Sequence, residues 1–296
     1  MKRIILPTDF SKQATYALDL ACDFAKKGNA SITLIHVIEH SKKSVTFLGS
    51  SSLNTMASWS TGVEMDDIYF VELYRKRREQ MAEVMADPKY VGLNIQDKIM
   101  MGSPYHAISE EIAEQNADFI IMGTTGVNDW AESLIGSVAE KVVRNAKCPV
   151  LTLRNSVRFE DINNIAFASD FKEKLFPYAS IPKSIQEFFD AKLHLVYVNT
   201  PGSFKNERTI KTRLGDFANE NGFKNFEIHL YSHEHEEEGI VCFSEDYKMD
   251  MVMMATEGRS GFSRLFEPSI AEDVVNYSKK PVVTFNMHKL ESVPKA

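Results

Sequence analysis

A glycine-rich segment at 123–137, with the spacing G-x2-G-x9-G-S, carries the residue types best suited to binding an anion. Glycines allow a ligand to approach the backbone closely. Gly136-Ser137 is expected to begin a helix, whose free N–H groups and positive dipole end attract negative charge. The segment follows an apolar run at 118–122 that predicts a buried strand. We therefore expect it to bind phosphate, although a plain glycine turn is the alternative.

Two other strand ends would lie near this segment if the sheet is parallel. Pro7-Thr8-Asp9 follows a short apolar run, and Val37-Ile38 ends a second one. In open parallel sheets, ligands bind beyond the carboxyl ends of the strands, where the strand order reverses. Asp9 alone could equally be a helix cap. The three segments together favour a ligand site.

The histidines and methionines have simpler explanations. His36 stands within an apolar strand and is expected to be buried and hydrogen-bonded. His229, His233 and His235, with glutamates beside them, could hold a metal ion, but a solvated loop explains them more simply. The methionines of 250–254 are expected to be strand core rather than soft-metal ligands. We therefore predict no metal site and no catalytic residues.

The elements that would position these residues occur twice along the chain. The sequence IILPTDF at 4–10 corresponds to IAFASDF at 165–171, and ITLIHV at 32–37 corresponds to LHLVYV at 193–198. Later correspondences have a shorter offset, so the first half carries about 29 additional residues between its second and fourth strands. Such self-similarity indicates two copies of one structural unit.

Each copy alternates strands with helices, which predicts an α/β fold with a parallel, doubly wound, five-stranded sheet. The expected fold is thus two Rossmann-like sheets in tandem, with domains at 1–154 and 163–287 and a polar linker at 155–162. Strands are expected at 2–7, 31–38, 93–101, 118–122 and 149–153 in the first half, and near 163–168, 192–198, 225–231, 250–254 and 281–285 in the second.

Two features bear on assembly and regulation. The halves end in β-prone residues at 151–153 and 282–285, and an exposed edge strand is a liability that a twin can cover. We therefore expect an intrachain pseudo-dimer of the two halves.

The Ser/Thr-rich segment His40–Asp67 interrupts the alternation of strands and helices, and we expect it to be a mobile cover or a partner-docking element near the ligand.

The composition excludes several classes of protein. With 296 residues, 44% of them hydrophobic and 25% charged, the chain is typical of a soluble globular protein. A net charge of −7 argues against nucleic acid as a partner, and no apolar run is long enough to span a membrane. The three cysteines form no CxxC pair, which favours reduced thiols in the cytoplasm.

The motifs LPTDFS, LIHVI and GSVAEKVVRNAKCPVL, together with the glycine spacing, resemble the nucleotide-binding branch of the universal stress protein family. The resemblance covers both halves. It implies an adenine nucleotide alpha hydrolase-like fold, pairing through the last strand, and ATP, with or without Mg²⁺, as the ligand. Carried over by position, it assigns Pro7, Thr8, Asp9 and Val37 to the nucleoside, and Met122, Gly123, Thr125, Gly126, Gly136, Ser137 and Val138 to the ribose and phosphates.

The second half departs from this pattern at two glycines. Ala255 replaces Gly123, and Pro268, which has no N–H to donate, replaces Gly136. We expect a degenerate copy that does not bind ATP in the same way. At Thr125, the family commonly has a longer polar or basic side chain.

The predicted function is that of a cytoplasmic, ATP-binding regulator of the stress response, acting through a protein partner or a homodimer that the sequence does not identify. Two alternatives remain open, namely a slow ATPase or self-phosphorylating enzyme, and a scaffold that binds no nucleotide. Against a dedicated enzyme, the chain has no GxxxxGK[ST], SGGxD or HxGH motif.

Overall fold

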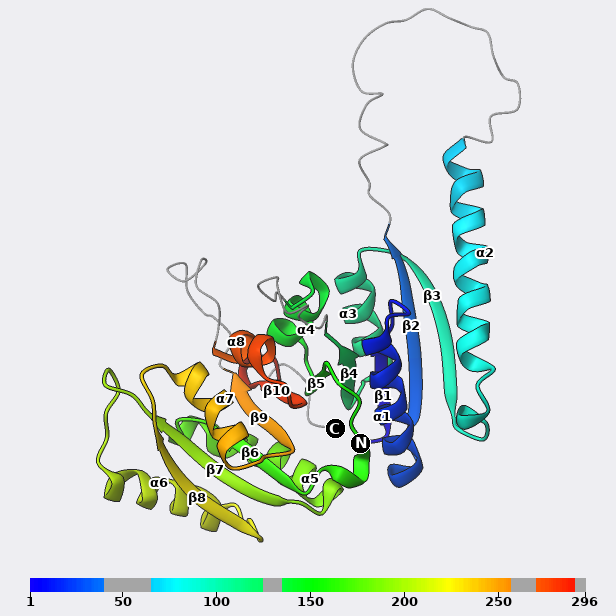
Figure 1. Cartoon of the computed structure of the whole chain (residues 1–296). Helices are drawn as coiled ribbons and strands as arrows, with labels where there is room; N and C mark the ends of the chain where they lie inside the picture. The colour runs from blue at the N-terminus through cyan, green and yellow to red at the C-terminus, as the bar shows by residue number, and fades with distance from the viewer. Residues whose placement is uncertain (40–64, 125–134, 257–269, 291–296) are drawn as a thin grey trace, which may run out of the picture.

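The computed structural model of the chain describes residues 1–39, 65–124, 135–256 and 270–290 (Figure 1). The strands of the first half are β1 (Arg3–Pro7), β2 (Ser31–Glu39), β3 (Ile95–Gly102), β4 (Phe119–Gly123) and β5 (Val150–Leu153). Those of the second half are β6 (Asn164–Ala168), β7 (Lys192–Asn199), β8 (Phe226–Ser232), β9 (Met251–Thr256) and β10 (Val282–Asn286).

Helices alternate with these strands, as the sequence predicts. The first half contains α1 (Lys12–Gly28), α2 (Met65–Met85), the short 3-10 helix η2 (Pro88–Tyr90), α3 (Pro104–Gln115) and α4 (Ser137–Asn145). The rest of the described chain contains η3 (Phe159–Asp161), η4 (Glu173–Tyr178), α5 (Ser180–Phe189), α6 (Glu207–Glu220), α7 (Glu236–Asp246), α8 (Ile270–Tyr277) and α9 (Met287–Leu290).

The described strands form one sheet in the order β3-β2-β1-β4-β5-β10-β9-β6-β7-β8. Strand pairs within each half are parallel, whereas β5 and β10 pair antiparallel, with Leu151 opposite Val283. The two five-stranded parallel units are thus present and are joined edge to edge (Figure 1). This joint confirms the predicted pairing of the halves through their last strands.

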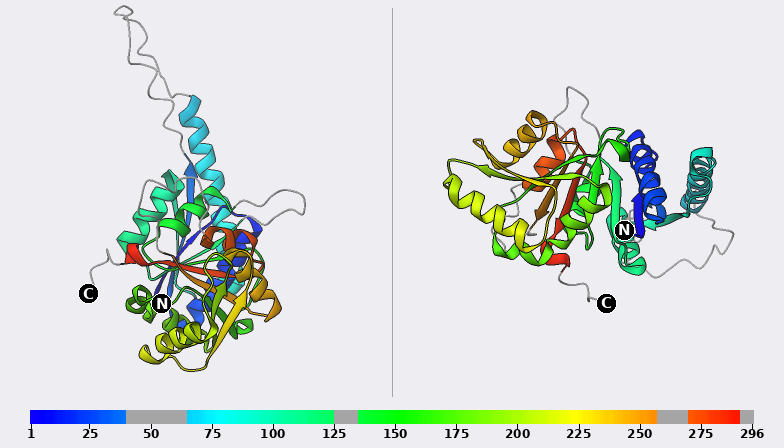
Figure 2. Two further views of the ribbon diagram at one scale, coloured as in Figure 1. Left: turned by 90° about the vertical axis from the view of Figure 1, so that its left-hand side faces the viewer. Right: turned by 90° about the horizontal axis from the view of Figure 1, so that it is seen from below.

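The hydrophobic core lies on both faces of this sheet. Along β1, Ile4 and Leu6 belong to the cluster that includes α1, while Ile5 belongs to the cluster that includes α3 and α4. The alternation follows from the two-residue period of a strand, and it explains why the strand is apolar throughout. Figure 2 shows helices on both sides of the strands in each half.

Polar contacts reinforce the joint between the halves. The guanidinium of Arg144 on α4 makes a bidentate pair with the carboxylate of Glu272 on α8, at 2.8 and 2.7 Å. The Glu272 side chain is only 5% exposed. Nearby, the amide of Ile135 donates to Asn276 Oδ1 at 2.7 Å. The carboxylate is therefore buried at the joint and neutralised across it, which fixes the halves relative to each other.

The connector between the halves is packed rather than merely polar. It includes η3, whose Phe159 stacks on Phe189 of α5 at 4.7 Å and meets Phe24 of α1 edge-on at 5.6 Å. The predicted linker at 155–162 therefore joins the two halves through an aromatic cluster. Because most residues around Phe159 are polar, the sequence alone does not indicate this contact.

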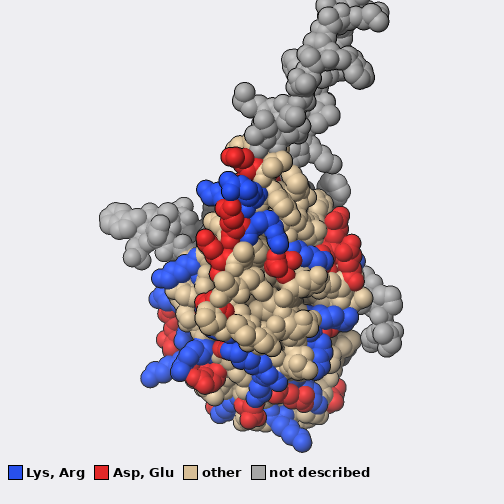
Figure 3. Space-filling model, turned by 90° about the vertical axis from the view of Figure 1, so that its right-hand side faces the viewer, with Lys and Arg blue, Asp and Glu red and all other residues tan. Residues whose placement is uncertain are grey.

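Helix α2 lies outside β3, and most of it is exposed apart from its C-terminal part around Met81 (Figure 1). Most of the basic run Arg75-Lys76-Arg77-Arg78 is exposed, and Arg75 pairs with Glu79 while Arg78 pairs with Asp97. Figure 3 looks onto this side and shows basic and acidic side chains intermixed. The predicted cover at His40–Asp67 lies outside the described residues, except where α2 begins.

Across the described ranges, none of the helices has both the length and the apolar character required to cross a membrane.

Candidate nucleotide pocket

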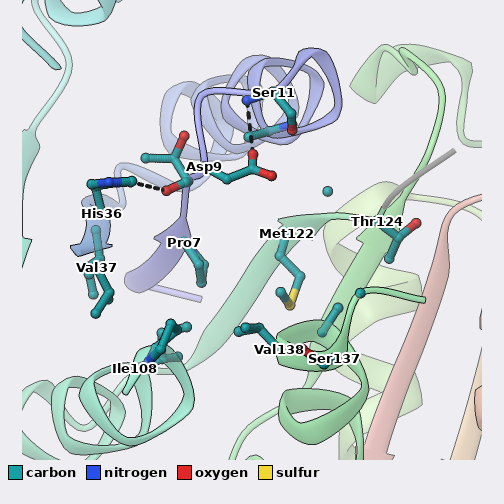
Figure 4. Close-up of a pocket in the computed structure, with 17 residues that line it drawn as sticks. Pro7, Asp9, Ser11, His36, Val37, Ile108, Met122, Thr124, Ser137 and Val138 are labelled. Atoms are coloured by element: carbon teal, nitrogen blue, oxygen red, sulfur yellow. Dashed lines mark hydrogen bonds between the residues drawn. The ribbon is translucent and has the colours of Figure 1, made fainter. Parts of the chain in front are cut away.

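A cavity of about 280 Å³ opens at the carboxyl ends of β1, β2 and β4, beside the first turns of α1, α3 and α4 (Figure 4). This is the edge of the sheet where the strand order reverses, so the topology places it where ligands bind in open parallel sheets. It is lined by Pro7, Thr8, Asp9, Ser11, Ala14, Ile35, His36, Val37, Pro104, Ile108, Met122, Gly123, Thr124, Gly136, Ser137, Val138 and Ala139.

Nine of the eleven residues predicted for a nucleotide line this cavity. They are Pro7, Thr8, Asp9, Val37, Met122, Gly123, Gly136, Ser137 and Val138. The other two, Thr125 and Gly126, lie outside the described residues. Segments separated by more than one hundred residues are thus brought together around one space.

One side of the cavity is apolar. Figure 4 shows Pro7, Val37, Ile108, Met122 and Val138 around it, contributed by two strand ends, a strand and two helices. Met122 is 5% exposed and Ile108 is 1% exposed, so these walls are held by the core rather than by loops. An apolar wall of this kind suits the face of a planar base.

Asp9 stands at the polar side of the cavity, next to the start of α1. Its Oδ1 accepts a hydrogen bond from the amide of Ser11 at 2.9 Å (Figure 4). Ser11 is itself the N-cap of α1, and its Oγ accepts from the amide of Ala14 at 3.2 Å. Asp9 therefore supports the helix start, and its exposed carboxylate also borders the cavity.

His36 is buried and hydrogen-bonded, as predicted. Its Nδ1 lies 2.8 Å from the carbonyl oxygen of Thr8, and a carbonyl can only accept, so Nδ1 carries the proton. Burial lowers the pKa of His36, against the opposing effect of this hydrogen bond. The ring also packs on Phe10 at 4.6 Å. The neutral imidazole fixes the strand end that carries Thr8 and Asp9.

The two described glycines of the loop have different steric surroundings. A Cβ on Gly123 would lie 2.5 Å from the backbone carbon of Gln13 and 2.8 Å from the amide nitrogen of Ala14. Gly123 is therefore required for the close approach of α1. A Cβ on Gly136, by contrast, would meet nothing within 4 Å. Gly136 is the N-cap of α4 and has no side chain to cap it, and no group of the described residues accepts from the first N–H groups of α4, which lie beside the cavity.

Several lining residues are absent from the prediction. Pro104 and Ile108 come from α3, which begins directly after β3 at the same edge of the sheet. Ser103-Pro104 marks that helix start in the sequence, so the signal was present. Ser11, His36, Thr124 and Ala139 lie within two residues of predicted ones, and only the three-dimensional course of the chain shows that they reach the same space.

The corresponding edge of the second half is built differently. Ala255 stands in the place of Gly123, and the element that follows Asp170 is the 3-10 helix η4, whereas the α-helix α1 follows Asp9. Asp170, the counterpart of Asp9, pairs with the ammonium of Lys172 at 2.8 Å. Pro268 lies outside the described residues. Asp170 is thus paired with the cation two residues further along the chain. In the first half that place is taken by Ser11, which carries no charge.

This fold and cavity define a tandem α/β protein with a pocket at the carboxyl edge of its first half. Residues 1–154 and 183–286 match the universal stress protein family, and the chain belongs to this family with two copies of its domain. The chain is similar to universal stress protein MJ0531 of Methanocaldococcus jannaschii, with 33% identity over 52% of this chain and 82% of that protein.

Two further relatives agree. Universal stress protein MJ0577 of the same organism is 30% identical over 52% of this chain and 94% of its own length. The crystal structure of a universal stress protein from Archaeoglobus fulgidus matches with a TM-score of 0.73 and 22% identity, over 96% of this chain and 98% of that one. The last likeness shows that the fold is shared over nearly the whole length.

Proposed function

We propose that this chain is a cytoplasmic regulator of the stress response that binds one ATP in the cavity of its first half. In this proposal the halves act as domains at 1–154 and 163–287. The observation that carries the proposal is that an apolar wall and the start of α4, whose N-cap Gly136 has no side chain, converge on one cavity. ATP carries a planar base and a chain of phosphates, which match an apolar wall beside a helix N-terminus.

The lining residues suggest a role for each part of the cavity. Pro7 and Val37 would contact the base, and Asp9 would accept hydrogen bonds from the nucleoside. Gly136, Ser137 and the amides that follow would face the phosphates, with or without Mg²⁺. Binding energy from these contacts would favour one arrangement of the pocket edge and so alter the surface seen by a protein partner.

Slow hydrolysis of ATP is the second candidate function. The described lining includes an exposed carboxylate, Asp9, and an imidazole, His36. His36, however, uses its Nδ1 proton to hold the Thr8 carbonyl. The arrangement therefore favours binding over turnover. Incubating the pure protein with radiolabelled ATP, and separating the products, distinguishes the two.

The test of binding is calorimetry with the full chain and MgATP, after denaturing a sample to detect any nucleotide that copurifies. We expect one site per chain. The variant Asp9→Asn keeps the acceptor for the Ser11 amide but removes the charge, and should weaken ATP binding about tenfold, equivalent to about 1.4 kcal/mol.

Asp170→Asn is the matched control, because Asp170 holds the same position in the second half. It should leave the affinity for ATP unchanged. A wild-type chain that binds no adenine nucleotide at millimolar concentration would refute the proposal. Two equivalent sites would contradict its restriction to the first half.

A further inference from the structure

Three metal-ligating side chains meet on the outer strands of the second half, far in sequence from the nucleotide cavity. His194 lies on β7, and Glu227 and His229 lie on the neighbouring strand β8. His194 pairs in register with Glu227, and Val196 pairs with His229. Because alternate residues of a strand share one face, all three side chains project from the same face of the sheet. Their ligand atoms lie within 4.8 Å of one another.

The two imidazoles face each other through a nitrogen pair. His194 Nδ1 lies 2.9 Å from His229 Nε2. The carboxylate of Glu227 lies beside this pair, with Oε1 at 3.9 Å from His229 Nε2 and Oε2 at 4.0 Å from His194 Nδ1. The histidine side chains are 8% and 10% exposed, whereas that of Glu227 is 49% exposed. The cluster therefore opens to solvent on the side of the carboxylate.

A chain of hydrogen bonds sets the tautomer of His194. Asn164 Nδ2 donates to Asp250 at 3.4 Å, which leaves Asn164 Oδ1 to accept from His194 Nε2 at 3.2 Å. His194 Nε2 therefore carries the ring proton, and Nδ1 presents a lone pair to the cluster. In protein metal sites, a histidine ligand typically donates its other ring N–H to an oxygen in this way.

We propose that His194, His229 and Glu227 bind a divalent transition-metal ion of the zinc type, with water completing the coordination. Two imidazole nitrogens, one carboxylate oxygen and an open position form a common donor set for such an ion. Ligand atoms around a tetrahedral Zn²⁺ lie about 3.4 Å apart, as follows from bonds of about 2.0–2.2 Å. The imidazole nitrogens lie 2.9 Å apart and His229 Nε2 lies 3.9 Å from Glu227 Oε1, so these two separations bracket this value. One ligand atom from each of the three residues lies within 4.8 Å of the other two, so modest side-chain movements suffice.

The charge state of the cluster suits a cation. Burial lowers the pKa of His194 to about 4 and also lowers that of His229, so both rings are neutral near pH 7. On binding, the His229 proton would move from Nε2 to Nδ1, and the ring would stay neutral. Lys192 opposes the ion, because its ammonium pairs with Glu227 Oε2 at 2.7 Å. Oε1, on the side of His229, remains directed toward the cluster.

The first half provides a natural comparison. By strand register, Thr33, Gln96 and Lys98 occupy the places of His194, Glu227 and His229. Lys98 brings a positive charge to the position of a ligand, so the first half should bind no metal there. The proposal therefore predicts one such site per chain.

The experiment is calorimetric titration of the full chain with zinc chloride, after treatment with a chelator and its removal. All proteins carry Cys242→Ser, because Cys242 Sγ lies 3.9 Å from His233 Nε2 and could bind zinc separately. We expect one equivalent of zinc to bind, and His194→Gln and His229→Gln to weaken it at least tenfold each. Glu227→Gln should weaken it at least threefold.

His106→Ala is the matched control, since His106 is an exposed histidine of the first half, and it should leave zinc binding unchanged. Glu227 is exposed, so Glu227→Gln keeps the test decisive even if a histidine variant fails to fold. Absence of zinc binding to the Cys242→Ser protein at millimolar concentration would overturn the proposal. An affinity unchanged in either a folded histidine variant or Glu227→Gln would also overturn it.

Discussion

The same place in the two repeats is built with opposite chemistry. In the first half, the carboxylate of Glu111 on α3 is 1% exposed beneath β2 and β3 and is paired with Lys98. Gln115 donates to the same carboxylate, and Thr33 donates to Gln115 at 2.8 Å. This half thus buries a charge and satisfies it with a cation and an amide.

The second half dispenses with the buried charge. Phe243 and Tyr247 occupy the positions of Glu111 and Gln115, and their rings stack at 4.5 Å. His229 replaces Lys98 and packs against both rings, at 5.1 and 5.0 Å. The comparison teaches that the contact between this helix, α3 or α7, and its sheet must fill the space and leave no buried polar group without a partner. Either an ion pair or stacked rings meets this requirement. The side-chain chemistry is then free to serve something else.

The largest effect is expected from breaking the first half's ion pair. Lys98→Met leaves Glu111 buried without its cation and should lower the free energy of unfolding by about 3 kcal/mol. The double variant Lys98→Met with Glu111→Leu imitates the apolar arrangement of the second half and should lose less than about 1 kcal/mol. Urea unfolding followed by circular dichroism measures both. Equal losses in the single and double variants would show that the charge is not the cause.

An intermediate effect is expected at the two glycines. Gly123→Ala forces a Cβ against the backbone of Gln13 and should lower stability by about 1–3 kcal/mol. Gly136→Ala meets open space and should change stability by less than about 1 kcal/mol. Thermal unfolding of the two variants separates the packing glycine from the helix-cap glycine. A reversed order would mean that α1 does not depend on Gly123.

The smallest effect concerns pH. The pKa of His36 is lowered by burial, so the unfolded chain binds more protons than the folded one as the pH falls through about 6.5. Stability should therefore decrease as the pH falls below neutrality. His36→Asn keeps a donor for the Thr8 carbonyl and cannot titrate, so its stability should depend less steeply on pH between 7 and 5. Parallel slopes for the two proteins would contradict this account.

Much of the fold could be predicted because its signals are local. Apolar runs, helix caps such as Ser11 and the internal repeat indicated the strands, the helices and their order. The joint between β5 and β10 followed from the need to cover edge strands. The predicted domain limits and the bound nucleotide stay predictions, since neither is tested by the fold itself.

The contacts between side chains of different elements could not be predicted. They depend on how neighbouring strands are aligned, which a single sequence does not specify. His194 and His229 are 35 residues apart, and only the pairing of β7 with β8 brings them together. Sequence proximity suggested His233 and His235 as companions of His229 instead. Similarly, the steric role of Gly123 depends on where α1 passes. The residues that were hardest to predict are those whose partners come from another element.

The antiparallel joint of β5 and β10 also has an evolutionary consequence. In a dimer of identical subunits, every substitution appears on both sides of the symmetry axis. Here the subunits are covalently continuous, so each can accumulate changes alone while its twin keeps the ancestral residue. The equivalent places of the two halves already differ, with Gly123 in the first and Ala255 in the second. The association is also unimolecular, so dilution does not separate the halves and a diverging copy never loses its partner.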